Sequence, residues 1–192
     1  REPYHTPMLP IPELLADLVR RPSVNPMGRT DLPPDVLYEH LVTDYLETHL
    51  RSLGVPVTRT AVAPGRDNLV ATFTPARPTF SVVWECHQDG RLYGRGACDV
   101  KAGAAAMLAA FARLVADNPP HSAAVTLAFT VDEEHTFLGV QHLVAAGVRA
   151  DCAIVAEPTQ LNVVVAHKGV ARWQLHTAGV AGHSSRPDRG VN

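Results

Sequence analysis

The sequence has 192 residues, a length that suits one well-buried domain with a short remainder. A net charge of -2 gives neither the basic footprint of a nucleic-acid-binding protein nor the polybasic segment of a membrane-surface protein. The three widely spaced cysteines, Cys86, Cys98 and Cys152, indicate no disulfide framework and favour a reducing compartment. Because there is also no apolar signal region and no run of about 18 apolar residues, we expect a cytoplasmic protein that binds neither nucleic acid nor membranes.

The first third of the chain predicts two amphipathic helices followed by two strands. Leucines and valines share one face of a helix over residues 11–21. A second helix, over 38–53, shows the same spacing of apolar residues at i, i+3 and i+4. Strands are then predicted over 55–62 and 68–74, on either side of a turn at Pro64-Gly65.

The middle of the chain alternates between strands and helices. The order is a strand over 80–84, a long helix from near Lys101 to Asn118, a strand over 124–131, a helix over about 137–146 and a strand over 152–156. This alternation predicts an α/β fold with a mixed, mostly parallel sheet and helices on both of its faces.

The pattern changes after this alternation. Two strands are predicted in quick succession, over 162–166 and 171–178, and a stretch rich in Gly and Ser follows. We therefore expect a first domain over 1–167 and the start of a second, α+β domain over 168–192, which stops before such a domain could close.

Polar side chains follow the predicted strands at the points where ligands collect in open α/β sheets. In chain order these residues are His87 and Asp89, Asp132 to Glu134, and Glu157, and Asp99 joins them from just before the helix that starts near Lys101. Carboxylates that converge on one edge of a sheet repel one another unless a cation holds them together. Nitrogen and oxygen donors of this kind suit Zn²⁺ or a similar divalent ion. The alternative is that these acidic residues are simply solvated at wet strand ends.

The spacing within two of these clusters suggests separate roles. In the His-x-Asp pattern, Asp89 could accept the ring N–H of His87 and thereby fix the tautomer of a metal-bound imidazole. Of the adjacent Glu133 and Glu134, one could bind a metal while the other acts as general base. A Glu pair at the start of a helix is otherwise an ordinary favourable charge at the positive end of the helix dipole.

Five motifs in order resemble those of the M20 metallopeptidases, the group that contains acetylornithine deacetylase, succinyl-diaminopimelate desuccinylase and carboxypeptidase G2. The motifs are Asp89-Gly90-Arg91-Leu92-Tyr93-Gly94-Arg95-Gly96-Ala97-Cys98-Asp99-Val100-Lys101, Thr130-Val131-Asp132-Glu133-Glu134, Ala153-Ile154-Val155-Ala156-Glu157-Pro158-Thr159, Ala166-His167-Lys168-Gly169 and Gly182-His183-Ser184-Ser185-Arg186-Pro187. The opening stretch from Leu18 to Pro26 is also similar to the family's N-terminal helix and loop. The resemblance implies a zinc-exopeptidase-like catalytic domain followed by a lid domain.

The resemblance implies a ligand set for two zinc ions, with Co²⁺ as a substitute. His87 and Glu157 would bind the first metal and Glu134 the second. Asp99 would bridge the two metals, with the cis peptide bond to Val100 that the family shows.

It also implies catalytic roles for three residues. Asp89 would orient the zinc ligand His87, Glu133 would be the general base, and His183 of the lid would reach across a homodimer to polarise the scissile carbonyl. The implied reaction is hydrolysis of the amide bond of N-acyl amino acids or small peptides, as in acetylornithine deacetylase, by a hydroxide bound to two zinc ions.

Two departures from the family pattern support an alternative. Only the eleven residues 88–98 separate His87 from Asp99, fewer than in the family, and the family's last His ligand lies beyond this chain. The alternative is therefore a truncated or decayed member that binds metal or an amino acid without turnover. A nucleotide-binding α/β module is a third reading, but Gly94-x-Gly96 lacks the rest of a phosphate-binding loop.

Overall fold

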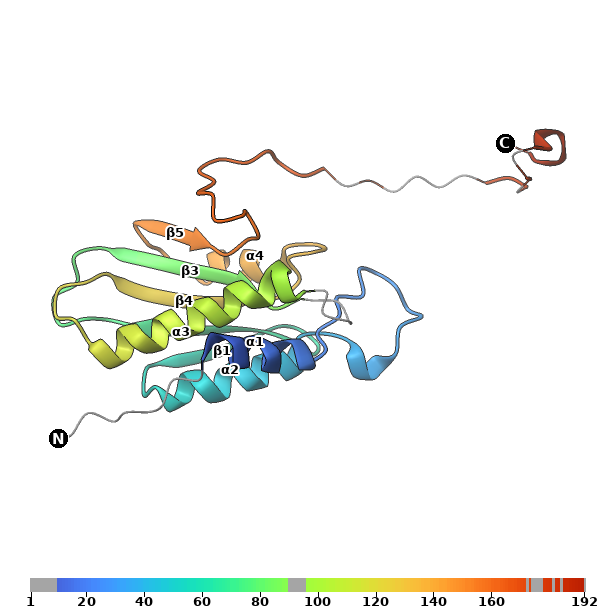
Figure 1. The fold of residues 1–192 in the computed structure, drawn as a ribbon. Coiled ribbons are helices and arrows are strands. Elements are labelled where there is room, and N and C mark those ends of the chain that lie inside the picture. Colours follow the sequence, from blue (N-terminus) through green and yellow to red (C-terminus); the bar gives the residue numbers. More distant parts are fainter. Residues whose placement is uncertain are drawn as a thin grey trace. The chain divides into compact units, whose positions relative to one another are not determined.

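The protein is described here by a computed structural model, which covers residues 10–89, 96–171, 173, 178–180, 182–183 and 185–191 (Figure 1). The chain divides into two compact units, Arg1–Gln160 and Leu161–Asn192. The boundary expected from the sequence, between residues 167 and 168, falls inside the second of these units.

The two helices expected near the N-terminus are present. Helix α1 (Ile11–Arg20) has a proline in its first turn, where no backbone N–H is needed, and it buries Leu14 and Leu18. Helix α2 (His40–Ser52) buries an apolar stripe of Val42, Leu46 and Leu50. A short 3-10 helix, Pro34–Val36, lies between them.

Five strands form one mixed sheet in the order β1-β2-β4-β3-β5. Their bounds are Val57–Ala63 (β1), Arg66–Phe73 (β2), Ser81–His87 (β3), Ala124–Thr130 (β4) and Cys152–Val155 (β5). Strand β2 is antiparallel to both β1 and β4, whereas β3 is parallel to β4 and β5. The expected mixed sheet is therefore confirmed, but only two of its four strand pairings are parallel, so it is not mostly parallel. The predicted site residues His87, Glu133 and Glu157 follow strands of the parallel half.

Helices cover both faces of the sheet, as expected. Helix α3 (Ala102–Asp117) joins α1 and α2 on one face, where Phe111 packs in a core with Leu69, Leu127 and Phe129. Helix α4 (Leu138–Ala145) lies on the other face (Figure 1). Asn68 precedes Leu69 on β2, so its side chain lies on the opposite face of the sheet from that core. There it donates to the carbonyl of Gly139 in α4 at 2.7 Å.

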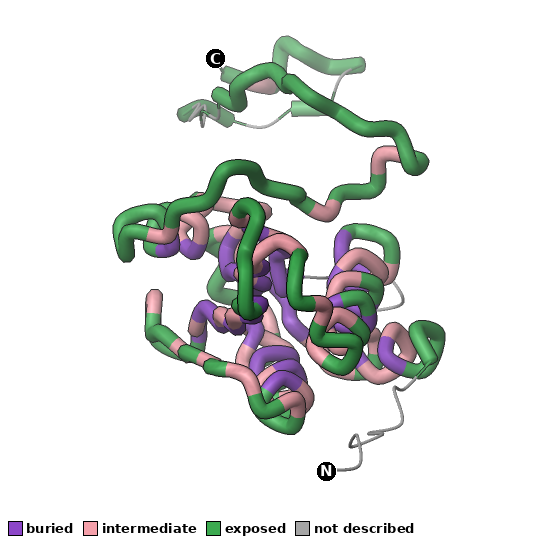
Figure 2. The backbone as a smooth tube through the Cα atoms, turned by 90° about the vertical axis from the view of Figure 1, so that its left-hand side faces the viewer, coloured by how far each residue is buried: buried purple, intermediate pink, exposed green. Residues whose placement is uncertain are grey.

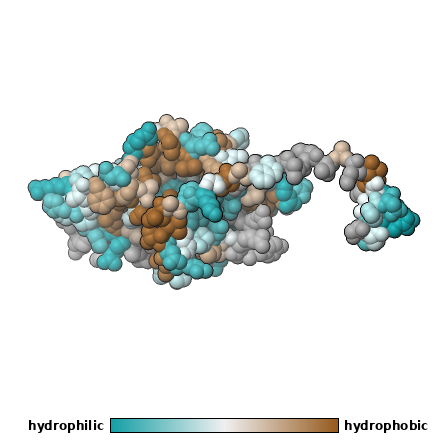
Figure 3. Space-filling model, turned by 90° about the horizontal axis from the view of Figure 1, so that it is seen from above, coloured by the Kyte–Doolittle hydropathy of each residue, from teal (hydrophilic) through white to brown (hydrophobic). Residues whose placement is uncertain are grey.

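The two units differ in burial (Figure 2). Buried residues of the first unit gather where the helices pack against the strands, whereas nearly all described residues from 161 onward are exposed. Within the first unit, the edge strand β5 is exposed along its whole length. Figure 3 views the molecule from the side on which β5 lies in Figure 1, and apolar patches alternate there with hydrophilic surface.

The strand expected over residues 162–166 does not form. A strand needs a partner for its backbone N–H and C=O groups, and no ladder to these five exposed residues exists among the residues described. Much of the second expected strand, over 171–178, lies outside the described residues. The described part of the second unit contains a bridge between Val180 and Val191 and a 3-10 helix, Pro187–Arg189.

The described helices include none that combines the length and the apolar character needed to cross a membrane.

Candidate metal centre

Parallel pairing brings the ends of three strands to one edge of the sheet. His87 is the last residue of β3 and pairs in register with Thr130, the last residue of β4. Glu133 follows three residues after Thr130, and Glu157 follows two residues after the end of β5. Because parallel strands run in the same direction, the loops that follow them meet at a common edge.

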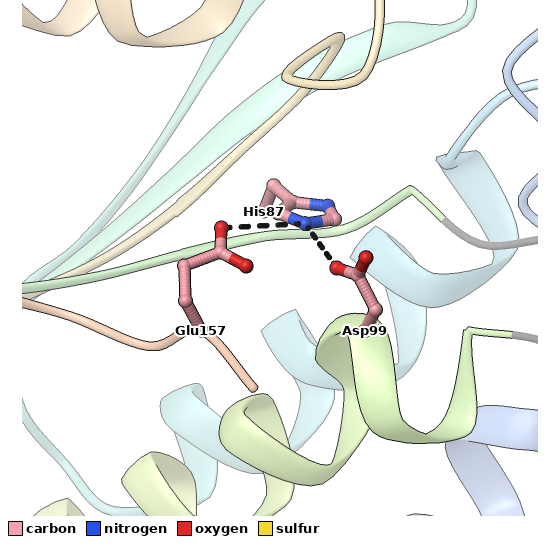
Figure 4. A group of neighbouring side chains, drawn as sticks. All are labelled: His87, Asp99 and Glu157. Carbon is pink, nitrogen blue, oxygen red and sulfur yellow. Dashed lines mark hydrogen bonds and ion pairs between the residues drawn. The ribbon is translucent and has the colours of Figure 1, made fainter. Parts of the chain in front are cut away.

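His87, Asp99 and Glu157 form a compact group at this edge (Figure 4). Nε2 of His87 lies 3.2 Å from Oδ1 of Asp99 and 3.9 Å from Oε1 of Glu157. One potential ligand atom from each of the three residues lies within 4.8 Å of the other two. Oε2 of Glu133 is also 3.9 Å from Nε2 of His87. The structure thus brings together four of the predicted site residues.

Asp99 reaches this group from the turn that leads into α3. The peptide bond between Asp99 and Val100 is cis, as the family resemblance implied. Val100 is buried in the core, and the following Lys101 extends back to the end of α1. There Nζ of Lys101 donates to the carbonyls of Leu18 at 3.0 Å and Arg21 at 2.8 Å. The chain directly after Asp99 is therefore anchored, while the Asp99 side chain stays half-exposed.

The concentration of acidic groups raises the affinity of the site for positive charge. Burial raises the pKa of Glu157 to about 7, against the lowering effect of His87 and with a further contribution from Asp99. Burial likewise raises the pKa of Glu133, and the charge of Glu134 raises it further against the opposing effect of His87. Carboxylates in this state bind protons when no other cation neutralises them.

The donor set fits Zn²⁺. One imidazole and two carboxylates are ligands found in zinc sites, where three protein ligands leave a position open for water or substrate. His87 is almost completely buried, yet its Nδ1 has no hydrogen-bond partner among the described residues. Its other ring nitrogen, Nε2, is the one that faces the carboxylates. The imidazole is thus held with a single nitrogen directed at the candidate metal position.

Asp89 has partners other than the one expected. The sequence predicted that it accepts the ring N–H of His87. Its Oδ2 instead accepts from Nδ2 of Asn25 at 2.8 Å, and its Oδ1 accepts from the backbone N–H of Asp132 at 3.0 Å. Asp89 therefore supports the backbone near His87 and makes no hydrogen bond to its ring.

Two further predicted site residues lie outside the group of three. Glu134 is half-buried beside Glu133 and acts on it through its charge. His183 belongs to the second unit, where its Nδ1 lies 2.9 Å from Oγ of Ser185. Ser184 and residues 90–95, which belong to the motifs of the sequence, are outside the described residues.

Sequence reasoning missed a buried polar network next to this site. Arg66 contacts Glu39 and Asp132, and Asn25 bonds to both Asp89 and Asp132. Burial raises the pKa of Asp132, but hydrogen bonds from Thr136 and Asn25, together with the charge of Arg66, lower it overall. Nothing in the spacing of these residues marks them as partners, because they come from separate elements.

Comparisons with known proteins agree with this architecture. Residues 63–185 match the peptidase family M20/M25/M40. An acetylornithine deacetylase from Photorhabdus laumondii is 30% identical over 204 residues, covering 95% of this chain and 51% of that protein. A succinyl-diaminopimelate desuccinylase from Methylibium petroleiphilum is 37% identical over 143 residues, covering 69% of this chain and 37% of that protein.

Solved structures share the fold. A tripeptidase from Staphylococcus aureus superposes with a TM-score of 0.62 at 19% identity, covering 94% of this chain and 52% of that one. An M20 family metallo-carboxypeptidase from Sulfolobus solfataricus gives a TM-score of 0.62 at 18% identity, covering 78% and 37%. The chain spans about half or less of the length of the relatives it matches. With the family matched over most of the chain and its acidic motifs gathered at one sheet edge, the protein belongs to peptidase family M20/M25/M40.

Proposed function

We propose that this chain is the metal-binding part of a hydrolase that cleaves the amide bond of N-acyl amino acids or small peptides. The observation that carries the proposal is the group of His87, Asp99 and Glu157, which points one nitrogen and two carboxylates at a common position. Relatives named as a deacetylase and a desuccinylase support the choice of an acyl group on an amine as the substrate class.

His87 and Glu157 would hold a first zinc ion, and Asp99 would be shared with a second ion bound by Glu134. Zinc, when bound, would supply a Lewis acid and lower the pKa of a water molecule towards about 7. Asp99 suits the shared position because its side chain is half-exposed and approaches Nε2 of His87 to 3.2 Å from another element. Co²⁺ is expected to replace Zn²⁺ in this site.

Glu133 is proposed as the general base. Its Oε2 is close to Nε2 of His87 without being part of the group of three, and its raised pKa favours taking up a proton from water and releasing it to the leaving amine. Asp89 would support the strand end that carries His87. His183 would stabilise the developing oxyanion from a lid domain of a homodimer, with residues 1–167 as the catalytic domain and 168–192 as the start of the lid.

The test uses the full-length protein with N-acetylornithine and N-succinyl-diaminopimelate as substrates. Dialysis against a chelator is expected to abolish hydrolysis, and added Zn²⁺ or Co²⁺ is expected to restore it. His87→Ala should lose both metal and activity, whereas His142→Ala, an exposed position in α4 that is not part of the group of three, should retain both. Turnover that persists after complete metal removal would reject the proposal.

A non-catalytic metal binder is the second candidate, and one observation favours it. The compact group contains donors for one metal position and does not include Glu134. Titration with Zn²⁺ separates the two candidates. Two tight sites per full-length chain support the hydrolase, and one site without hydrolysis of either substrate supports the binder.

A further inference from the structure

We propose that Arg66 and Asn25 are positioning residues for the metal centre. They would hold Asp89, two residues after the end of β3, against Asp132, two residues after the end of β4, and so set the distance between His87 and Glu133. This inference rests on the proposed metal-binding function, and it assigns a role to a buried network that contributes no ligand atom to the group of three.

Arg66 is a buried cation that hydrogen-bonds to two acidic residues at once. It is the first residue of β2, and its Nε donates to Oε2 of Glu39 at 2.9 Å while its Nη2 donates to Oε1 of the same carboxylate. Its Nη1 donates to Oδ1 of Asp132 at 2.6 Å. The planar guanidinium can make this fork on one carboxylate and still reach a second one, which a lysine ammonium cannot do.

Asn25 joins the two strand ends directly. Its Nδ2 donates to Oδ2 of Asp89 at 2.8 Å and to Oδ1 of Asp132 at 2.9 Å. The backbone N–H of Asp132 completes the link by donating to Oδ1 of Asp89 at 3.0 Å. The two aspartates are almost completely buried, so these bonds are shielded from competition with water.

The charges in this network require Arg66. Three carboxylates, those of Glu39, Asp89 and Asp132, lie around one guanidinium, with Nη2 of Arg66 3.9 Å from Oδ2 of Asp89. Removing the cation would leave buried carboxylates that repel one another. The link between the two aspartates is therefore expected to open when Arg66 is lost.

The network acts on the site through the backbone. Asp89 is two residues after His87, and Asp132 immediately precedes Glu133. Holding Asp89 and Asp132 together therefore fixes the chain on both sides of the 3.9 Å contact between His87 and Glu133. Residues that support metal ligands from outside the coordination sphere typically change metal affinity by about 10- to 100-fold when they are replaced.

The test is a Co²⁺ titration of this chain, followed by visible absorption. Arg66→Met and Asn25→Ala are expected to weaken Co²⁺ binding by about 10- to 100-fold and to change the Co²⁺ spectrum. The matched control is Arg59→Met, because Arg59 pairs with Asp44, Glu47 and Asp67 at 2.6–2.9 Å instead of with Asp89 or Asp132. It is expected to bind Co²⁺ with wild-type affinity and spectrum.

A double variant separates positioning from stability. Arg66→Met with Glu39→Gln removes one unpaired carboxylate, so its unfolding midpoint should recover towards that of the wild type while its Co²⁺ affinity stays weak. Asn25→Ala keeps the net charge, so it tests the positioning role if Arg66→Met does not fold. Wild-type Co²⁺ affinity in folded Asn25→Ala and in the folded double variant would overturn the positioning role alone. Absence of Co²⁺ binding by the wild-type chain would overturn the metal site itself, and this role with it.

Discussion

At the scale of single residues, we expect metal binding and proton transfer to depend on different side chains. Glu133 is near Nε2 of His87 but outside the group of three, so Glu133→Gln removes a base while leaving that group intact. Hydrolysis by the full-length protein should fall by about 10²- to 10⁴-fold, with Zn²⁺ affinity unchanged. Initial rates and calorimetric Zn²⁺ titration measure the two effects. Loss of Zn²⁺ binding in this variant would instead make Glu133 a ligand.

The pKa of Glu157 predicts an unusual dependence of stability on pH. Folding raises this pKa from 4.5 to about 7, so the folded state binds more protons than the unfolded state between these values. The free energy of unfolding of the metal-free chain should therefore fall as the pH rises through this window. Urea unfolding at pH 5 and pH 8 measures the change.

Two controls accompany that measurement. Glu157→Gln cannot ionise and should show a smaller fall in stability from pH 5 to pH 8. Saturating Zn²⁺ should restore stability at pH 8, because the ion binds the carboxylate form. Equal pH dependence in the wild type and in Glu157→Gln would contradict the assignment of the raised pKa to this residue.

The candidate metal ligands could be predicted from the sequence, but the residues that hydrogen-bond around them could not. His87 and Glu157 follow predicted strands and Asp99 precedes a predicted helix, so the topology predicted that they would lie near one another, and the family resemblance implied their roles as ligands. Arg66 and Asn25 have no such signal, since a buried arginine at the start of a strand looks the same in sequence as a solvated one. The hydrogen-bond partners of Asp89 were not predicted for the same reason. Closeness in sequence indicated His87, whereas the partner Asn25 lies 64 residues away in the chain.

At the scale of elements, the packing of α4 against the sheet depends on a glycine. A Cβ at Gly139 would lie 2.4 Å from the backbone N and O of Val131 and 2.7 Å from Oδ1 of Asn68. Backbone atoms cannot move aside as a flexible side chain can, so Gly139→Ala should lower the free energy of unfolding by about 1–3 kcal/mol. Urea unfolding of Gly169→Ala is the control, because a Cβ at Gly169 would meet nothing within 4 Å.

Elements with a clear apolar period were predicted well, and elements that depend on a partner were not. Helix α3 and strand β4 follow directly from their apolar spacing, and both formed within one or two residues of the expected bounds. Residues 162–166 have the composition of a strand, yet they form none in the described part of the chain. Composition gives the preference of a segment, whereas the ladder needs a second segment in the right place.

At the scale of the whole molecule, His87, Asp99 and Glu157 all belong to the first unit. A chain that ends at Gln160 should therefore bind Co²⁺ with the affinity of the 192-residue chain. A chain that ends at Ala156 lacks Glu157 and should bind more weakly. Equilibrium dialysis of the two shortened chains, compared at the same pH, measures the difference. Loss of binding on truncation at Gln160 would show that the second unit contributes to the site.

The strand order also determines when the centre can assemble during synthesis. Strand β3 lies between β4 and β5, both of which follow it in the chain, and Glu157 is the last of the three residues to leave the ribosome. Glu157 follows His87 by 70 residues, so the group of three is incomplete until that part of the chain has been made. A nascent chain arrested before that point lacks Glu157 and is therefore expected to bind a metal ion more weakly than the complete first unit.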